Sequence, residues 1–223
     1  MKKTAIILAL ATFLCSCTNI NVNGGKTVKC GGDVIEQTMD FSGFSCIKVE
    51  GAAQIDFSQA DSFKVLVRAN EEVFNYLDYT LDDKELLIST KDHVNINAKE
   101  YIVLIEAPQL SSFDVDGAAK IRIPGGYRSG NSLEIDIDGA GKVDFRGVDV
   151  PNLALTIDGA GEFDLNNIKV EKLKIEVNGA GKGSVSGVAD YAKISVAGTA
   201  KINTAGLQCP DLEKNVDGLA VIK

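Results

Sequence analysis

Residues 135–145 read IDIDGAGKVDF, and similar stretches recur through the 223-residue chain. Successive copies are 19 to 22 residues apart, counted between their central glycines, which are Gly117, Gly139, Gly159, Gly179, Gly198 and Gly218. An earlier copy, VEGA at residues 49–52, stands apart from the others. Self-similarity at a nearly fixed period is the sequence signature of a repeat architecture.

Apolar and polar residues alternate around each glycine. Ile135 and Ile137 precede Gly139, and Val143 and Phe145 follow it, with Asp and Lys residues between them. Alternation with period two is typical of a strand with one buried face, and a glycine-containing corner is expected to join two such strands. One unit cannot bury its apolar face alone, but stacked copies can. The pattern therefore predicts an all-β fold, a right-handed parallel β-helix-like solenoid with repeats of about 20 residues.

An antiparallel sandwich or barrel is the alternative, because its short strands recur at comparable spacing. The inward positions recur at the same offset from each glycine, which favours coiling. Residues 38–110 differ from the repeats of residues 111–223: they hold strand-like runs at 63–69, 76–81, 85–90 and 101–107, joined by polar turns. We expect these runs to form an N-terminal antiparallel strand insertion, a meander that caps or flanks the repeats.

The N-terminus has the pattern of a secreted lipoprotein. Lys2 and Lys3 precede an apolar run at residues 4–14, which is shorter than the roughly 20 residues that span a bilayer. The four residues that end at Cys17 resemble the lipobox of bacterial lipoproteins. We therefore predict a signal peptide at residues 1–16, lipidation of Cys17, a tether at residues 17–37, and membrane contact through the lipid anchor. An ordinary signal peptide with incidental cysteines is the alternative.

Charge and cysteine content limit the possible partners. The formal charge of −8 predicts repulsion of phosphate backbones, so we expect no nucleic-acid partner. Cys30, Cys46 and Cys209 follow the predicted signal peptide and lipidation site, and an odd number allows at most one internal disulfide. Cys30 and Cys46 could pair in an oxidising periplasm. Three partly buried free thiols are the alternative.

The candidate ligand site is a row of carboxylates. Asp116, Asp138 and Asp158 each precede a central glycine and are expected to stack at the inter-strand spacing. They could bind Ca²⁺ or carbohydrate, or they could accept backbone N–H bonds in a turn. Asn178 and Ala197 replace the aspartate in later copies, which favours the turn role. A second row could neutralise the first and reads Lys120, Lys142, Glu162, Lys182 and Lys201.

No pattern in the chain predicts catalysis. His93 lies in a polar stretch without an obvious Ser or Cys partner, and no metal-ligand spacing, phosphate-binding loop or nucleophile elbow is present in the sequence. We therefore expect no enzyme, no catalytic residue, no metal and no cofactor. The first function hypothesis is an adhesin or binding module for a glycan or protein ligand, with Tyr101, Tyr127 and Tyr191 as candidate exposed aromatics.

Two other hypotheses remain. A periplasmic scaffold could form homo-oligomers through the terminal repeat at residues 216–222, which has no polar cap after it. The third hypothesis is a polysaccharide-active β-helix enzyme, although the repeated aspartates are equivalent in position and none is singled out.

The chain resembles a known family through FSGF at residues 41–44, VEG at 49–51 and the ordered DGAG-type repeats. This is the putative auto-transporter adhesin family with a head GIN domain, common in Bacteroidetes and catalogued as a domain of unknown function. The resemblance covers residues 38–223 and implies a β-helical, extracytoplasmic protein without catalytic residues. Surface-exported lipoproteins of that phylum usually carry acidic residues after the lipidated cysteine, whereas residues 18–23 are uncharged. We therefore expect an outer-membrane lipoprotein on the periplasmic face.

Overall fold

The computed structural model describes residues 26–223, so the predicted signal peptide, Cys17 and the first part of the tether lie outside the described residues. The N-terminal elements are β1 (Thr27–Cys30), β2 (Val34–Met39), β3 (Cys46–Gln59), β4 (Lys64–Asn70), the 3₁₀ helix η1 (Glu71–Asn75), β5 (Leu77–Asp82), β6 (Glu85–Thr90), the 3₁₀ helix η2 (Lys91–His93), β7 (Asn95–Ala98) and β8 (Tyr101–Ala107). The repeats form β9 (Ser112–Ile123), β10 (Tyr127–Arg128), β11 (Leu133–Arg146), β12 (Val148–Gln208), β13 (Asp211–Gly218) and β14 (Val221–Ile222). Within residues 26–223, no helix is long and apolar enough to cross a membrane.

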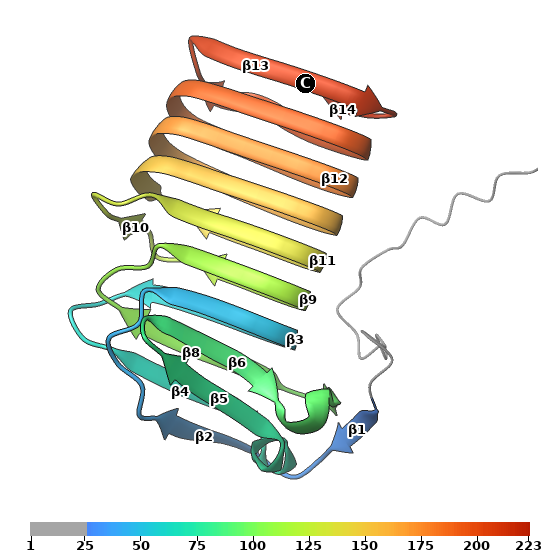
Figure 1. The fold of residues 1–223 in the computed structure, drawn as a ribbon. Coiled ribbons are helices and arrows are strands. Elements are labelled where there is room, and N and C mark those ends of the chain that lie inside the picture. The colour runs from blue at the N-terminus through green and yellow to red at the C-terminus, as the bar shows by residue number, and fades with distance from the viewer. Residues whose placement is uncertain (1–25) are drawn as a thin grey trace, which may run out of the picture.

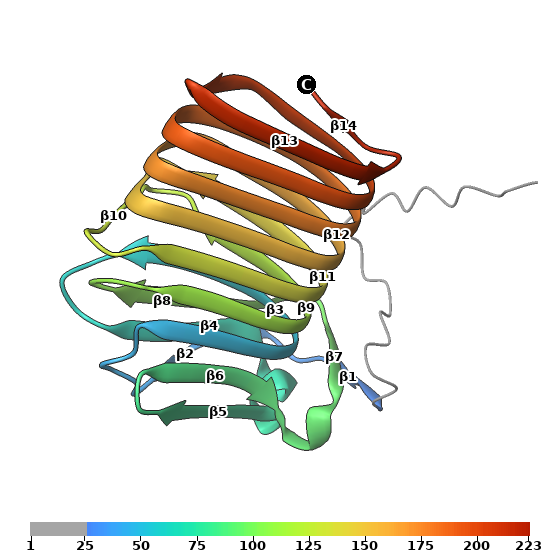
Figure 2. The ribbon, with the colours of Figure 1, turned by 45° about the horizontal axis from the view of Figure 1, so that its top comes forward.

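The repeats pair in parallel and in register. Gly117 lies opposite Gly51 and Gly139, and Gly139 lies opposite Gly159. β12 runs through 61 residues without a break, and the ribbon winds in successive turns that lie one above another (Figures 1 and 2). The prediction of an all-β, mainly parallel fold is confirmed, and the antiparallel sandwich is not what the chain forms.

Columns of apolar side chains fill the interior of the turns. In β9, Phe113, Val115 and Ile121 are buried, while Asp114 and Asp116 are exposed. Phe113 lies in register with Ile135, and its ring centroid is 6.4 Å from that of Phe145. Because every turn repeats the same alternation, each apolar row covers the row below it and removes it from water.

We expected the central glycines to be corners between separate strands, and this expectation was wrong. Gly139 has a φ of +125° inside the continuous strand β11, and the alternation of buried and exposed residues persists on both sides of it. A Cβ at Gly139 would overlap the carbonyl oxygen of Gly117 in the preceding turn. Glycine is therefore required both by the backbone conformation and by the close approach of the neighbouring turn.

The N-terminal strands cover one end of the stacked turns. Antiparallel pairs join β2 to β4, β4 to β8, and β5 to β6, while β6 and β8 run parallel to β3. The expected antiparallel pairs are therefore present, but they do not form a simple meander, because β4 pairs with β2 and β8 rather than with β5. This pairing follows from the end of the stack, because β6 and β8 both pair with β3.

The predicted tether was too long at its C-terminal end. Residues 27–30 form β1, which pairs in parallel with β7, and residues 34–39 form β2, which pairs with β4. Val28 packs partly buried against the core and Cys30 is buried. These contacts with strands distant in the sequence order a segment that local composition alone described as a linker.

The other end of the stack carries a charge in an apolar column. Lys214 of β13 lies opposite Ile194, at the position where earlier turns bury Phe113, Ile135 and Leu155. We expected the last repeat to lack a polar cap. Lys214 is exposed and places a charge on the last strand of the stack, and a charge on an edge strand discourages edge-to-edge pairing.

Candidate functional site

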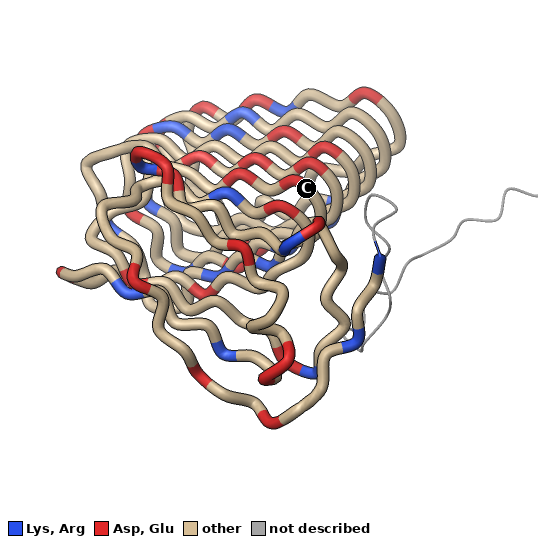
Figure 3. Tube along the Cα trace, turned by 60° about the horizontal axis from the view of Figure 1, so that its bottom comes forward, with Lys and Arg blue, Asp and Glu red and all other residues tan. Residues whose placement is uncertain are grey.

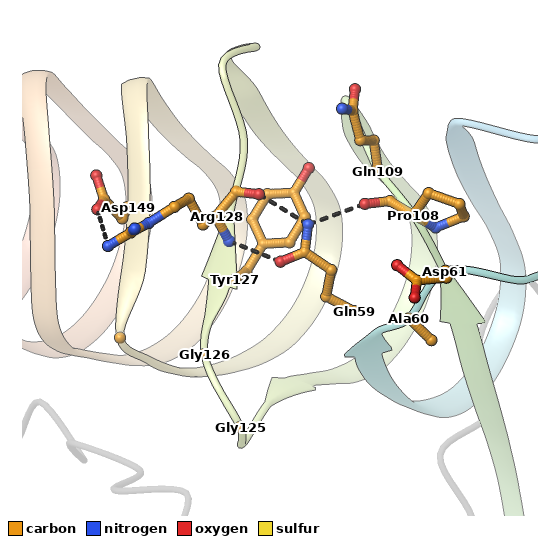
Figure 4. Close-up of a pocket in the computed structure, with 11 residues that line it drawn as sticks. Gln59, Ala60, Asp61, Pro108, Gln109, Gly125, Gly126, Tyr127, Arg128 and Asp149 are labelled. Atoms are coloured by element: carbon orange, nitrogen blue, oxygen red, sulfur yellow. Dashed lines mark hydrogen bonds and ion pairs between the residues drawn. The ribbon is translucent and has the colours of Figure 1, made fainter.

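An open depression of about 720 Å³ lies where the N-terminal strands meet the stacked turns. We call it the junction pocket (Figure 4). The residues that line it are Gln59, Ala60, Asp61, Pro108, Gln109, Gly125, Gly126, Tyr127, Arg128, Gly147 and Asp149. Its volume lies within the range of about 300–1,000 Å³ that is usual for small-ligand sites.

The pocket forms at the longest interval in the run of central glycines from Gly117 to Gly218. Twenty-two residues separate Gly117 from Gly139, although these two glycines lie in register on neighbouring strands. The additional length is accommodated between β9 and β11, where the short strand β10 pairs with residues 148–149 of β12. A lining that depends on this interval cannot recur in the repeats of about 20 residues.

Gln59 connects three segments of the pocket wall. Its Nε2 donates to the carbonyl oxygens of Pro108, at 2.9 Å, and Arg128, at 2.7 Å, and its Oε1 accepts from the Arg128 backbone N–H at 3.0 Å. Both amide N–H groups and the amide oxygen are therefore occupied by protein. Gln59 therefore fixes the shape of the pocket, and the neighbouring residues must supply the contacts with a ligand.

Tyr127 fixes the interior side of the pocket. Its side chain is buried, and its hydroxyl group donates to the Leu110 carbonyl oxygen at 2.6 Å and accepts from the Leu110 N–H at 2.9 Å. The Phe57 ring packs edge-on, with its centroid 5.7 Å away. The expectation that Tyr127 is an exposed aromatic was therefore wrong, because the ring fills the core below β10.

Charged groups of both signs line the rim. Arg128 Nη2 lies 2.9 Å from Asp149 Oδ2, and Lys169 Nζ reaches the same oxygen at 3.9 Å. The Arg128 side chain is 82% exposed, so most of its N–H donors face solvent. Asp61 is exposed and has no hydrogen-bond or ion-pair partner within the described part of the chain. Figure 4 shows Arg128 and Asp149 on one side of Gln59 and Asp61 on the other.

The predicted carboxylate row exists but lies outside the junction pocket. Asp116, Asp138 and Asp158 are exposed and in register, and Glu50 extends the row by one turn. Among the residues that the structure describes, no cluster of three or more His, Cys, Asp or Glu side chains could hold a metal ion. Asp158 Oδ1 accepts a hydrogen bond from Asn178 Nδ2 at 2.7 Å, so the row continues through a side-chain contact.

The turn role that we favoured for this row is not observed. None of the three aspartates accepts a backbone N–H bond in residues 26–223, because the strands continue through the glycines and keep their N–H groups in the sheet.

The lysine row pairs within itself, with Lys142 Nζ 3.2 Å from Glu162 Oε2. Figure 3 shows acidic and basic positions repeating from turn to turn along the outside of the stack.

The three cysteines that follow Cys17 carry free thiols, which was the alternative to a Cys30–Cys46 disulfide. Cys30 is in β1 beside η1, where burial and the nearby Glu72 raise its pKa. Cys46 begins β3, with its Sγ 3.5 Å from Ser111 Oγ. Burial acts to raise the pKa of Cys46, but hydrogen bonds from Ser111 and neighbouring serines outweigh it and lower the pKa.

The pocket lining can bind polar groups but offers no nucleophile with an adjacent base. Its ionisable side chains besides the tied Tyr127 are Asp61, Arg128 and Asp149, and Asp149 is already ion-paired. Glycoside hydrolysis requires one carboxyl group free to protonate the leaving group and a second to act as base or nucleophile. His93 is exposed in η2 and is not part of the pocket.

Apart from Tyr127, which was expected to be exposed, sequence reasoning missed the residues of this site. Gln59, Asp61 and Pro108 lie outside the glycine repeats, and neither Arg128 nor Asp149 occurs at an equivalent position in every copy. The available signal was the 22-residue interval itself, because an irregular repeat marks the place where a stack departs from its regular surface.

Comparison with known proteins gives a consistent relationship. A family model described as "Putative auto-transporter adhesin, head GIN domain" matches residues 43–223. The structure is similar to that of a putative adhesin from Bacteroides fragilis, with a TM-score of 0.63 at 16% identity, covering 88% of this chain and 99% of that one. A putative adhesin from Parabacteroides distasonis gives a TM-score of 0.55 at 14% identity, with 88% and 99% covered. At these identities the likeness shows a shared fold. None of the curated proteins compared with the chain matches it.

Proposed function

Since the chain belongs to the putative auto-transporter adhesin family with a head GIN domain, we propose that it is a non-catalytic binding module of the bacterial cell envelope that engages a glycan or protein ligand. The stacked turns are a right-handed parallel β-helix in this proposal, supported by the in-register parallel pairing of β3, β9, β11 and β12. Such a stack gives a rigid, elongated platform on which loops between strands can form a site.

The junction pocket is the observation that carries the proposal. It is formed at an irregular repeat, its walls are tied together by Gln59, and Arg128 and Asp61 at its rim are exposed. A surface that is held in place before ligand arrives loses less conformational freedom on binding. No nucleophile with an adjacent base lies in the lining, which supports recognition rather than chemistry.

The anchor and the location belong to the same proposal. Lipidated Cys17 would hold the domain at the outer membrane, and the uncharged residues 18–23 support the periplasmic face. Protease added to intact cells should then leave the domain uncut until the outer membrane is opened, as followed with an antibody against the domain. Cleavage on intact cells would contradict the periplasmic location, and a Cys17→Ser variant that still partitions with membranes would contradict the anchor.

Binding itself is tested with the purified full-length lipoprotein in detergent. An array of glycans and a set of envelope proteins are screened, and any positive partner is measured by calorimetry at two salt concentrations. We expect saturable binding with a defined stoichiometry. Turnover of a bound glycan into shorter products would contradict the non-catalytic proposal, and the absence of any saturable partner would contradict the binding module.

A periplasmic scaffold that associates with copies of itself is the second candidate, and the exposed end of the stack favours it. Val216, Leu219 and Val221 on the last turn are 47%, 84% and 49% exposed. Lys214 acts against such pairing. We expect the wild-type chain to stay monomeric in light scattering and a Lys214→Ile variant to associate at high concentration. A wild-type mass that rises with concentration would instead favour the scaffold.

A further inference from the structure

We propose that the junction pocket binds an uncharged saccharide, and that Arg128 and Asp61 make the contacts that select it. This inference rests on the proposed binding function and specifies its site and ligand class. Nothing in the glycine repeats indicates it, because the pocket is made by segments that are far apart in the sequence.

The rim of the pocket offers both hydrogen-bond donors and acceptors. Arg128 presents guanidinium N–H groups beyond the one that binds Asp149. The Asp61 carboxylate has no partner in residues 26–223 and accepts only, and Asp149 keeps one oxygen outside its two ion pairs. A hydroxyl group donates one hydrogen bond and accepts others, so the hydroxyl groups of a sugar can use both kinds of group.

The charge balance disfavours an anionic ligand. The lining contains two carboxylates and one guanidinium, and Arg128 is already paired with Asp149. An added acidic group would therefore meet the unpaired Asp61 carboxylate within a chain of formal charge −8. An uncharged ligand avoids this repulsion, whereas uronic acids and phosphates do not.

The pocket also offers little to an apolar ligand. Tyr127 is the aromatic residue of the lining, and only 2% of it is exposed. Small residues and backbone form much of the remaining wall, with Ala60, Pro108 and Gly126 among them. A lipid or an aromatic compound would bury little apolar area there, so polar contacts must supply the affinity.

The walls are fixed before ligand binds. Gln59 ties the backbone of residue 108 to that of residue 128, and the Tyr127 hydroxyl ties residue 127 to residue 110. Arg128 therefore projects from a backbone held by two independent sets of hydrogen bonds. A ligand that makes a few directional polar contacts gains most from a site whose geometry is already set.

The test uses the full-length lipoprotein in detergent on an array of uncharged and uronate-containing oligosaccharides, followed by calorimetry with the strongest uncharged one. We expect Arg128→Ala to weaken binding by about tenfold or more, since a charge-assisted hydrogen bond is lost. Asp61→Asn should weaken it several-fold for an uncharged ligand but strengthen it for an anionic one, so the sign of this effect tests the ligand class. Arg68→Ala is the matched control. Arg68 lies in β4, outside the pocket, and its Nε forms a comparable ion pair with Glu100 Oε1 at 2.8 Å.

Each outcome decides between the inference and the function on which it rests. If uncharged glycans bind all three variants as tightly as the wild type, the proposed site is wrong but the binding function stands. Recognition of uronates alone, or of a protein alone, would overturn the ligand class and also leave the function intact. The absence of any saturable ligand would overturn both. Thermal melts of the variants verify that a loss of binding is not a loss of fold.

Discussion

The column of central glycines predicts how much the stack depends on close contact between turns. In Gly159→Ala, the added methyl group would overlap the carbonyl oxygen of Gly139, and the backbone φ of +132° disfavours an L-residue. Gly51→Ala is the informative comparison, because Gly51 has a φ of +99° but no atom within 4 Å of the place where a Cβ would lie. The first substitution meets both penalties and the second meets only the backbone penalty.

The magnitudes follow from these two penalties. A residue held in a backbone region that only glycine favours costs about 1–3 kcal/mol, which is the expected destabilisation for Gly51→Ala. Forcing the turns apart around an added methyl group costs about 1–3 kcal/mol more. Gly159→Ala should therefore lower the free energy of unfolding by about 2–6 kcal/mol.

The assay is urea denaturation followed by far-ultraviolet circular dichroism, with Gly130→Ala as the control. Gly130 has no atom within 4 Å of the added Cβ and no positive φ, so its substitution should change stability by less than about 1 kcal/mol. Hydrogen exchange should localise the effect of Gly159→Ala to the turns on either side of it. If Gly159→Ala and Gly51→Ala differed by less than about 0.5 kcal/mol, the reasoning on contact between turns would be refuted.

Three further predictions concern charge, a partly buried hydroxyl pair and thiol reactivity. Asp138 lies directly opposite like charges in the carboxylate row. Asp138→Asn should therefore raise the free energy of unfolding by about 0.5 kcal/mol at low salt and by less at 1 M salt. Urea titrations at both salt concentrations would measure this difference. Burial raises the pKa of Tyr101 to about 12, and its hydroxyl group lies 2.7 Å from that of Tyr79. Because the unfolded chain loses this proton near about pH 10, the free energy of unfolding should fall as pH rises from about 10 to 12. The fall should be less steep in the Tyr79→Phe/Tyr101→Phe variant. The lowered pKa of Cys46 and the raised pKa of Cys30 predict that iodoacetamide at pH 8 alkylates Cys46 before Cys30, as peptide mass mapping would show. Equal rates at these two positions, or a protein without free thiol at either, would contradict this.

The repeat pattern was sufficient to predict the parallel stack, because every turn places the same residue types at the same positions. Ile135, Val143 and Phe145 are buried as the alternation requires. A second bend in each turn was missed, where Gly147 and Asn167 adopt left-handed backbone conformations. Asparagine tolerates this conformation better than most residues, so the glycine signal is interrupted at position 167.

The N-terminal segment was harder to predict for a physical reason. The runs at residues 63–69 and 101–107 were recognised as strands from their composition. Their partners, however, are set by the exposed edge of β3 and by β2. Strand pairing at long sequence separation depends on which edges remain unpaired, and alternation within one run contains no information about that.

The sequence by itself determined the kind of interior this protein has, since an apolar residue at every second position and a glycine every 19 to 22 residues allow stacked parallel strands to bury a continuous core. Only the tertiary structure decided the junction pocket, because Gln59, Pro108 and Arg128 meet through hydrogen bonds between segments up to 69 residues apart. A periodic pattern fixes what repeats from turn to turn. A site formed at the one long repeat depends on how that repeat packs against the N-terminal strands, and that packing exists only in three dimensions.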